Sequence, residues 1–287
     1  MTDLKSKERA GSLEDGHFSW AVSFTPANSF ITDISTWFAR DRGNWLSAVA
    51  WVSLLGALNI PEASARTALH RMTKSAYLHR ETRNGKAGYS VSESFCEWID
   101  DFGRGTSDDL MEVDSENQWV VVAFTVPEVR RADRHALRTI LGTLGFASLG
   151  NGVWLASAAR SSKAQQAIEA AEFDSYVEIF LAEHRGYSVT ADLIRRCWDI
   201  DNLAARYRTF INEVHERLEH EPLPDARTFA GFILTMNTWR RINADDPRIS
   251  PTVLPNGWPS DEAKKARDEL VRRFYSHARD YVESLHN

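Results

Sequence analysis

The chain has 287 residues, 43% of them hydrophobic, and its 34 basic and 40 acidic side chains give a net charge of −6. This composition excludes global disorder, and the length allows two or three domains with real cores. No apolar run approaches the roughly 20 residues that span a bilayer, and the N-terminus lacks the apolar segment of a secretory signal. Two cysteines, Cys96 and Cys197, without metal-ligand spacing do not make a disulfide framework. We therefore expect a cytoplasmic protein without membrane contact.

The first 28 residues are polar and charged and are predicted to form a flexible arm. It is either an arm without a role or one whose Lys5, Lys7 and Arg9 contact phosphate. A winged-helix domain is expected over 29–103. It begins with a helix over 30–42, which Gly43-Asn44 ends, and with an apolar helix over 47–58.

A third helix is predicted over 64–76 after the turn signal Asn59 to Glu62, an arrangement typical of a helix-turn-helix. Four residues have the spacing of one buried face: Ala65, Leu69, Met72 and Ala76. The rest of the surface carries polar and cationic side chains of the kind that contact phosphates and base edges in the major groove: Ser64, Arg66, Thr67, His70, Arg71 and Lys74.

A basic hairpin follows the third helix. Two strand-like runs, 77–82 and 89–91, flank a loop over 83–88 that contains Asn-Gly. Its polar residues Arg83, Asn84 and Lys86 are predicted to contact DNA. Between residues 64 and 90 six basic side chains oppose one acidic side chain, and nucleic acid is the polyanion that matches such a patch. The alternative is a solvated charged helix beside an ordinary hairpin. A short helix over 92–102 closes the domain.

An acidic segment that contains structure breakers is predicted to be a linker over 104–117. A central domain over 118–187 follows, with the order β-α-β-β-α-β of a ferredoxin-like fold. Its first strand, 119–126, is a continuous β-branched and aromatic run, which indicates a buried strand. The elements after it are a helix over 133–144, strands over 146–149 and 153–156, a helix over 161–171 and a strand over 176–182.

A helical C-terminal domain is expected over 188–287. The apolar spacing predicts helices over 198–218, 225–244 and 260–285. The fold class is therefore α+β: an N-terminal winged helix, a central ferredoxin-like βαββαβ domain and a helical C-terminal domain.

Three passages make the chain resemble the PaaX-like transcriptional repressors, regulators of phenylacetate and related catabolic operons. They are ARTALHRMTKSAYLHRETRNGKAGYSVSE, then WVVVAFTVPEVRRADRHALRTILGTLGFASLGNGVWLA, and lastly WDIDNLAARYRTF with TWRRINADDPRISPTVLPNGWPSDEA. The resemblance extends from about residue 29 to residue 281. It implies a homodimer that binds a palindromic operator in double-stranded DNA and is released by an acyl-coenzyme A or related effector.

Two-fold symmetry doubles the specific contacts of a single winged helix. The helix over 260–285 is the favoured dimer surface, and the central domain remains a second candidate.

An aryl-coenzyme A thioester is the expected effector, at the junction of the central and C-terminal domains. Guanidinium groups suit phosphates, and Trp faces suit aromatic acyl groups. Two groups of residues in the matching motifs combine these side chains: Arg195, Arg196 and Trp198, and then Trp239, Arg240 and Arg241. The alternative is a Trp-rich core with surface arginines. Where the family often has His-Glu, this chain has Asn237-Thr238. If that pair contacts the effector, a different effector is expected for this chain.

The central domain also resembles small CRISPR-associated adaptation nucleases, whose metal-binding Asp ends the first strand. Residues 124–128 read FTVPE and contain no Asp, which argues against nuclease chemistry. No nucleotide-binding, metalloprotease or nucleophile-elbow motif is present. We expect no enzyme, cofactor or metal. The alternative to a DNA-binding regulator is a protein-interaction or scaffolding module that uses a winged helix without sequence-specific DNA binding.

Overall fold

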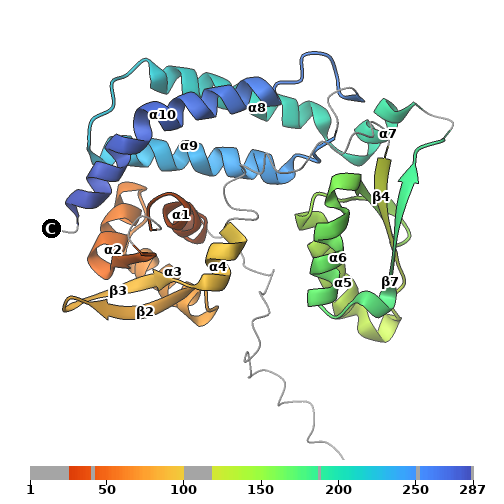
Figure 1. The fold of residues 1–287 in the computed structure, drawn as a ribbon, viewed down its shortest axis with the longest axis horizontal. Coiled ribbons are helices and arrows are strands. Elements are labelled where there is room, and N and C mark those ends of the chain that lie inside the picture. Colours follow the sequence, from red (N-terminus) through yellow and green to blue (C-terminus); the bar gives the residue numbers. More distant parts are fainter. Residues whose placement is uncertain (1–25, 40–42, 100–117, 187–188, 250–252, 286–287) are drawn as a thin grey trace, which may run out of the picture.

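A computed structural model describes residues 26–39, 43–99, 118–186, 189–249 and 253–285. The predicted linker 104–117 and nearly all of the predicted arm lie outside the described residues. Long C-terminal helices form one layer, and two smaller units project from the same side of it (Figure 1). Among the described residues, no helix has the length and apolar character needed to cross a membrane.

The first unit combines helices with a small antiparallel sheet. Its elements are α1 (Pro26–Ile34), a π-helical continuation (Ser35–Ala39), β1 (Trp45–Ser47), α2 (Ala48–Ala57), α3 (Glu62–Lys74), β2 (Leu78–Arg83), β3 (Lys86–Val91) and α4 (Glu93–Trp98). Ser47 and Ser92 cap α2 and α4 by accepting backbone N–H bonds. The sheet order is β1-β3-β2, and β1 is a strand that the apolar pattern did not predict.

The turn between α2 and α3 is tight, as predicted. Asn59 has a φ of +60°, and the Ile60 N–H donates to the Leu55 carbonyl at 3.0 Å, so the turn closes the C-terminus of α2. The helix α3 then ends at Lys74, earlier than predicted. Ala76, predicted to face the core, is exposed in the following turn with a φ of +57°, and its prediction was wrong.

The hairpin is tighter than predicted. Arg83 pairs with Lys86, so the loop contains only Asn84 and Gly85, with φ values of +50° and +75°. Positive φ at both positions is the geometry for which Asn-Gly is selected in two-residue hairpin turns. Gly88 pairs with Ser47 of β1 in the antiparallel sheet, and a Cβ there would approach the Leu46 carbonyl oxygen to 2.4 Å.

The central unit confirms the predicted ferredoxin-like order. It contains β4 (Gln118–Phe124), a 3-10 turn (Glu128–Arg130), α5 (Arg131–Thr143), β5 (Ala147–Gly150), β6 (Val153–Ser157), a 3-10 turn (Ala158–Arg160), α6 (Ser161–Ala170), a 3-10 turn (Asp174–Tyr176) and β7 (Val177–Glu183). The antiparallel sheet has the order β5-β6-β4-β7. One face of β4 packs with the hydrophobic residues of α5 and α6, while Trp119 on its other face packs against Leu193 and Ile194, which explains its continuous apolar run. The α+β class is thus confirmed.

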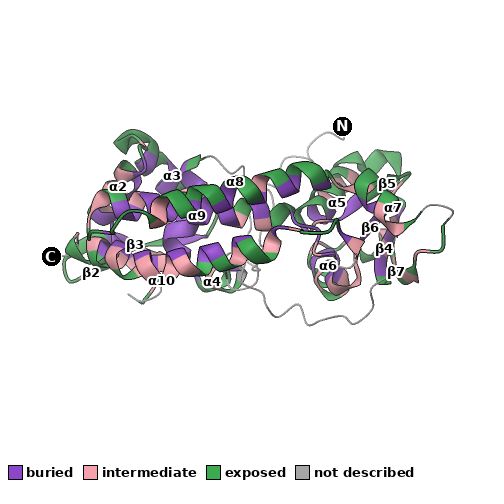
Figure 2. Cartoon of the chain, turned by 90° about the horizontal axis from the view of Figure 1, so that it is seen from above, coloured by how far each residue is buried: buried purple, intermediate pink, exposed green. Residues whose placement is uncertain are grey.

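The C-terminal region is helical, as predicted. Its elements are α7 (Thr190–Cys197), α8 (Ile200–Leu218), α9 (Ala226–Asp245) and α10 (Ser260–Ser284). Asp199 and Asp225 cap α8 and α9 through their carboxylates. Seen from above, α8, α9 and α10 run side by side along the molecule (Figure 2).

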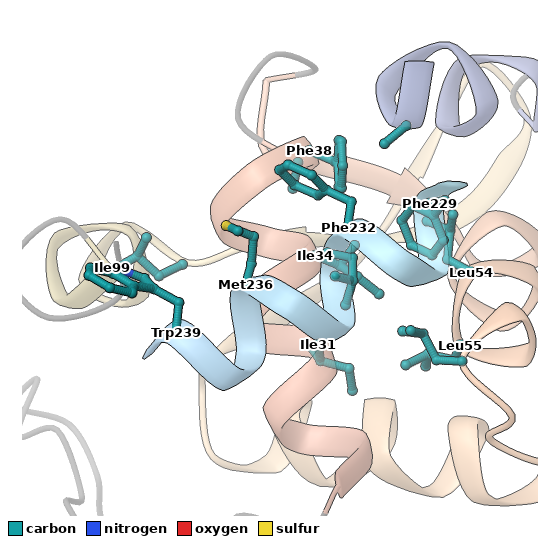
Figure 3. Close-up of a cluster of buried hydrophobic side chains, with 14 of the residues drawn as sticks. Ile31, Ile34, Phe38, Leu54, Leu55, Ile99, Phe229, Phe232, Met236 and Trp239 are labelled. Carbon is teal, nitrogen blue, oxygen red and sulfur yellow. The ribbon is translucent and has the colours of Figure 1, made fainter. Parts of the chain in front are cut away.

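The first unit and the C-terminal helices share one hydrophobic core (Figure 3). Ile31 and Ile34 of α1 face Phe232 and Met236 of α9, and all four are at most 1% exposed. Phe38 stacks on Tyr275 of α10 at 5.8 Å with an interplanar angle of 10°. The central unit has a core of its own. The predicted domain boundaries at residues 103 and 188 remain a prediction. The first unit and the helices α8, α9 and α10 nevertheless pack into one core.

Candidate nucleic-acid interface

The exposed face of α3 carries all six residues that the sequence predicted for DNA contact. Ala65, Ala68, Leu69 and Met72 are buried and pack α3 against α1, α2 and β2. The helical repeat therefore turns the remaining positions outward, and each of them is exposed: Ser64, Arg66, Thr67, His70, Arg71 and Lys74.

These six side chains differ in their existing partners. The Arg66 guanidinium pairs with Glu62 one turn earlier at 2.8 Å, with both side chains more than 60% exposed. The Thr67 hydroxyl donates to the Ala63 carbonyl at 2.8 Å. Arg71 and Lys74 have no hydrogen-bond or ion-pair partner within the described ranges. They are therefore the cations of this face that are most available to a phosphate or a base.

The hairpin holds its arginine in place. Arg83 pairs with Glu81 at 2.8 Å, donates to the Gly43 carbonyl at 3.2 Å and lies over the Trp45 ring at 5.8 Å. Glu81 raises the pKa of Arg83, and the hydrogen bond from Arg83 lowers the pKa of Glu81. The positive charge that the sequence assigned to Arg83 at the hairpin tip is thus neutralised by Glu81. Asn84 and Lys86 are exposed at the tip.

One exposed cation was missing from the predicted contacts. Arg80 lies on β2, opposite Tyr89 of β3, and is exposed beside the exposed His79. The sequence counted Arg80 in the local charge but did not assign it to the interface, because strand register decides which face it occupies. The candidate interface therefore has Arg71 and Lys74 on α3, whose side chains have no partner among the described residues, and a further exposed cation on β2.

The residues predicted to bind an effector have separate environments. Arg240 makes a buried ion pair with Asp33 of α1, with 2.7 Å between Nε and Oδ1, and the two side chains are 12% and 2% exposed. The Asn237 amide donates to the other Asp33 oxygen at 2.5 Å. The Trp239 ring is buried against Phe210 and beneath the Arg267 guanidinium. Trp239 and Arg240 thus join α9 to neighbouring elements.

The other trio lies by the central sheet. Trp198 stacks on Trp119 of β4 at 6.2 Å, and its indole N–H donates to the Gly145 carbonyl at 3.2 Å. Arg195 and Arg196 are exposed on α7, where Arg195 lies 3.8 Å from Asp192. Trp198 therefore packs the C-terminal region against the central unit.

A buried arginine strengthens this junction. The Arg160 Nη2 donates to the Asp246 carbonyl at 3.0 Å, and the Asp246 carboxylate accepts from the Tyr207 hydroxyl at 2.6 Å. Burial, with the charge of Arg248, lowers the pKa of Arg160 to about 10, although Asp246 opposes that shift. Sequence reasoning missed Arg160, because a lone Arg after a strand gives no sign of its burial.

An open groove of about 430 Å³ lies between α8 and α9. Arg241 enters it as an exposed side chain, while Arg206 is bound to Asp245 at 2.7 Å. Polar and apolar side chains line the groove, and none of them is aromatic, in contrast to the Trp-lined pocket that the sequence predicted. Its lining residues are Asn202, Ala205, Arg206, Thr209, Thr238, Arg241, Ile242 and Asp245. Within the described ranges, no cluster of three or more His, Cys, Asp or Glu side chains is arranged to bind a metal.

Most of the chain matches models of known protein families. Residues 27–95 match the model of the PaaX-like protein, residues 112–194 the PaaX protein central Cas2-like domain, and residues 198–284 the PaaX-like protein C-terminal domain. No curated protein matches the sequence. The structure is similar to that of an uncharacterized protein, Rv0674 from Mycobacterium tuberculosis, with a TM-score of 0.60 and 18% identity over 91% of this chain and 99% of that one. At this identity the likeness concerns the fold alone.

Proposed function

This chain belongs to the PaaX-like family of transcriptional regulators, and we propose that it acts by binding double-stranded operator DNA through a winged helix. The exposed face of α3 carries the proposal. Its available cations, Arg71 and Lys74, project from a helix whose other face is packed on α1 and α2. A helix held in this way by a preceding helix and a tight turn is suited to enter a major groove.

The contacts divide into two kinds. Arg66, Thr67, His70 and Arg71 are proposed to face base edges, and Lys74 to contact phosphate. In the wing, Lys86 and Asn84 are proposed to contact the backbone or the minor groove. Arg83 is a weaker candidate than the sequence indicated because Glu81 and Trp45 already hold it. Arg80 joins the proposed phosphate contacts.

Titration of DNA at several salt concentrations tests this proposal. A suitable probe is the DNA upstream of the gene and of its neighbours, with scrambled DNA of equal length as competitor. Log affinity should fall linearly with log salt, and each phosphate contact adds about 0.9 to the slope. Replacing Arg71 and Lys74 by Ala should weaken binding and flatten the slope.

The matched control for the Arg71 and Lys74 variant removes two cations from a different surface. Arg208 on α8 and Arg227 on α9 are also exposed, so their double Ala variant removes the same charge. That variant should bind DNA like the wild type. Equal weakening by both double variants, or binding that does not respond to salt, would instead favour the protein-interaction module.

The regulatory role is proposed in finer detail from the family resemblance. The chain is proposed to repress an aromatic-acid catabolic operon and to release DNA when an aryl-coenzyme A thioester binds at the junction of the central and C-terminal regions. A ligand that prefers the DNA-incompetent conformation would shift the population toward it. Arg195, Arg196, Trp198 and Arg241 remain the proposed contacts, since Trp239 and Arg240 already have buried partners.

The effector proposal is tested by screening aryl-coenzyme A thioesters for release of bound DNA. Arg241→Ala should raise the thioester concentration that is needed, whereas Arg208→Ala, on α8 outside the groove lining, should not. Release that is equal in both variants would place the site elsewhere. If no thioester releases DNA from the wild type, the effector belongs to another chemical class.

A further inference from the structure

The central sheet has two edges, and they differ in how well they are protected against pairing. The strand β5 has four residues and a register irregularity between Ser148 and Gly150. The strand β7 pairs with β4 along all seven residues without a break, from Val177 to Glu183. Short strands, bulges, Pro and Lys protect natural edges against pairing. The strand β7 is neither short nor bulged and has no Pro or Lys, although it carries Glu178 and Glu183, so it is the less protected of the two edges.

The backbone of β7 presents regular donors and acceptors. The Thr125 N–H donates to the Tyr176 carbonyl at 3.0 Å, which extends the β4 register by one pair. In an antiparallel ladder, alternate residues bond to the neighbouring strand. Residues 177, 179, 181 and 183 therefore direct their N–H and C=O groups away from β4. Among the described residues, no other strand pairs with this edge.

Large apolar side chains lie along the same edge. Phe180 is 52% exposed and Leu181 is 65% exposed, and as successive strand residues they project from opposite faces of the sheet. In both views β7 lies at the end of the molecule that is remote from the first unit (Figures 1 and 2). Both side chains flank an edge that has no partner strand among the described residues, so a strand added at this edge would cover them.

We propose that β7 pairs antiparallel with β7 of a second copy, about a two-fold axis that passes through Phe180. The inference rests on the proposed function, because it supplies the dimer that a two-fold symmetric operator requires. It selects the central domain over the helix 260–285 as the dimer surface. Two 4-stranded sheets would become one continuous sheet.

The charge pattern of β7 fits this register. Glu178 of one copy faces Ala182 of the other, and Glu183 faces Val177, so no acid opposes an acid across the ladder. Like charges directly opposite each other destabilise a pair of strands. Glu183 is also bound to Arg185 at 2.7 Å within its own chain. All outward N–H and C=O groups from 177 to 183 find partners.

The side chains also match across the axis. Phe180 meets Phe180 of the second copy at a position where the backbones are not hydrogen-bonded and opposite Cα atoms lie about 4.5 Å apart. Leu181 meets Ile179 on the face that α5 and α6 cover. The pairing thus removes both exposed apolar side chains from water.

Disulfide trapping and mass measurement test this interface in the full chain. Native cysteines are replaced by Ser, and Phe180→Cys is oxidised mildly. The opposed Cα atoms fall within the range of about 4.4–6.8 Å that a disulfide needs, so Phe180→Cys should form a cross-linked dimer. Leu149→Cys, exposed on the bulged edge β5, is the matched control and should stay monomeric on a non-reducing gel.

Light scattering gives the second readout. The wild type should have twice the 32.5 kDa mass of one chain, and Phe180→Lys, which sets two cations opposite each other, should have the monomer mass at micromolar concentration. A monomeric wild type, an unchanged dimer in Phe180→Lys or equal cross-linking of both cysteine variants would overturn the interface. DNA titration separates the two proposals: a wild type that cross-links through β7 but binds no DNA refutes the proposed function alone.

Discussion

Arg240→Ala is expected to destabilise the protein strongly, because it leaves the buried Asp33 carboxylate without its cationic partner. Asp33 has a side chain only 2% exposed, and Arg240 donates to both of its oxygens, at 2.7 and 3.2 Å. Removing one partner of a buried ion pair typically costs about 3–5 kcal/mol of unfolding free energy. The Asn237 bond to Asp33 remains in the variant, so we expect a loss at the lower end, about 3 kcal/mol.

Urea unfolding followed by circular dichroism measures this loss. At a slope of about 3 kcal/mol per molar urea, the midpoint should fall by about 1 M. Arg66→Ala is the matched control, since it removes an ion pair at 2.8 Å whose side chains are 61% and 64% exposed. An exposed pair contributes at most about 1 kcal/mol, so its midpoint should hardly move.

A second substitution tests the cause. Asp33→Asn in the Arg240→Ala background removes the stranded charge, so it should restore part of the lost stability. If Arg240→Ala instead unfolds at the wild-type urea concentration and only its response to a thioester is lost, the buried pair is not structural. Arg240 would then be the effector contact that the sequence predicted.

Three further results are expected. Arg71→Ala should lose about 1–3 kcal/mol of discrimination between operator and scrambled DNA with little change in melting temperature; operator affinity equal to wild type would refute the assignment. Gly88→Ala should unfold the first unit, since its Cβ would lie 2.4 Å from a carbonyl oxygen, whereas Gly142→Ala, in open space within α5, should stabilise by up to about 1 kcal/mol, as thermal melts would show. Burial raises the pKa of Tyr77 to about 12 and also raises that of Tyr207; the folded state thus keeps protons that the unfolded state loses above about pH 10, and stability should fall from there upward. Unfolding midpoints that are constant from pH 9 to 11 would contradict this.

Local pattern predicted the elements well where one physical signal dominates. The run WVVVAF forms β4, buried on both faces, and Asn84-Gly85 forms a two-residue turn. The end of α3 was placed too late, because Ala76 keeps the helical spacing of an apolar face although the chain has already turned.

Partners that are distant in the sequence could not be predicted. Arg240 meets Asp33 207 residues away, and no periodicity indicates such a pair. Burial separates the roles of similar residues in the same way. Trp239 and Arg240 have buried partners while Arg241 stays exposed, although all three belong to one motif. The exposed face of α3 was predictable because a basic, polar stripe opposite an apolar one is a local signal.

The shared core has a consequence for synthesis on the ribosome. Residues from Ala27 to Ile99 share their core with residues as late as Val282. The first unit therefore leaves the ribosome before the helices that cover its core are synthesised. At about 5–20 residues per second, the intervening chain takes on the order of 10–40 s to appear. The central unit, whose core is its own, is free to fold during that interval. Nascent chains halted near residue 220 should therefore protect the central unit from protease while the proposed DNA-binding unit is still digested.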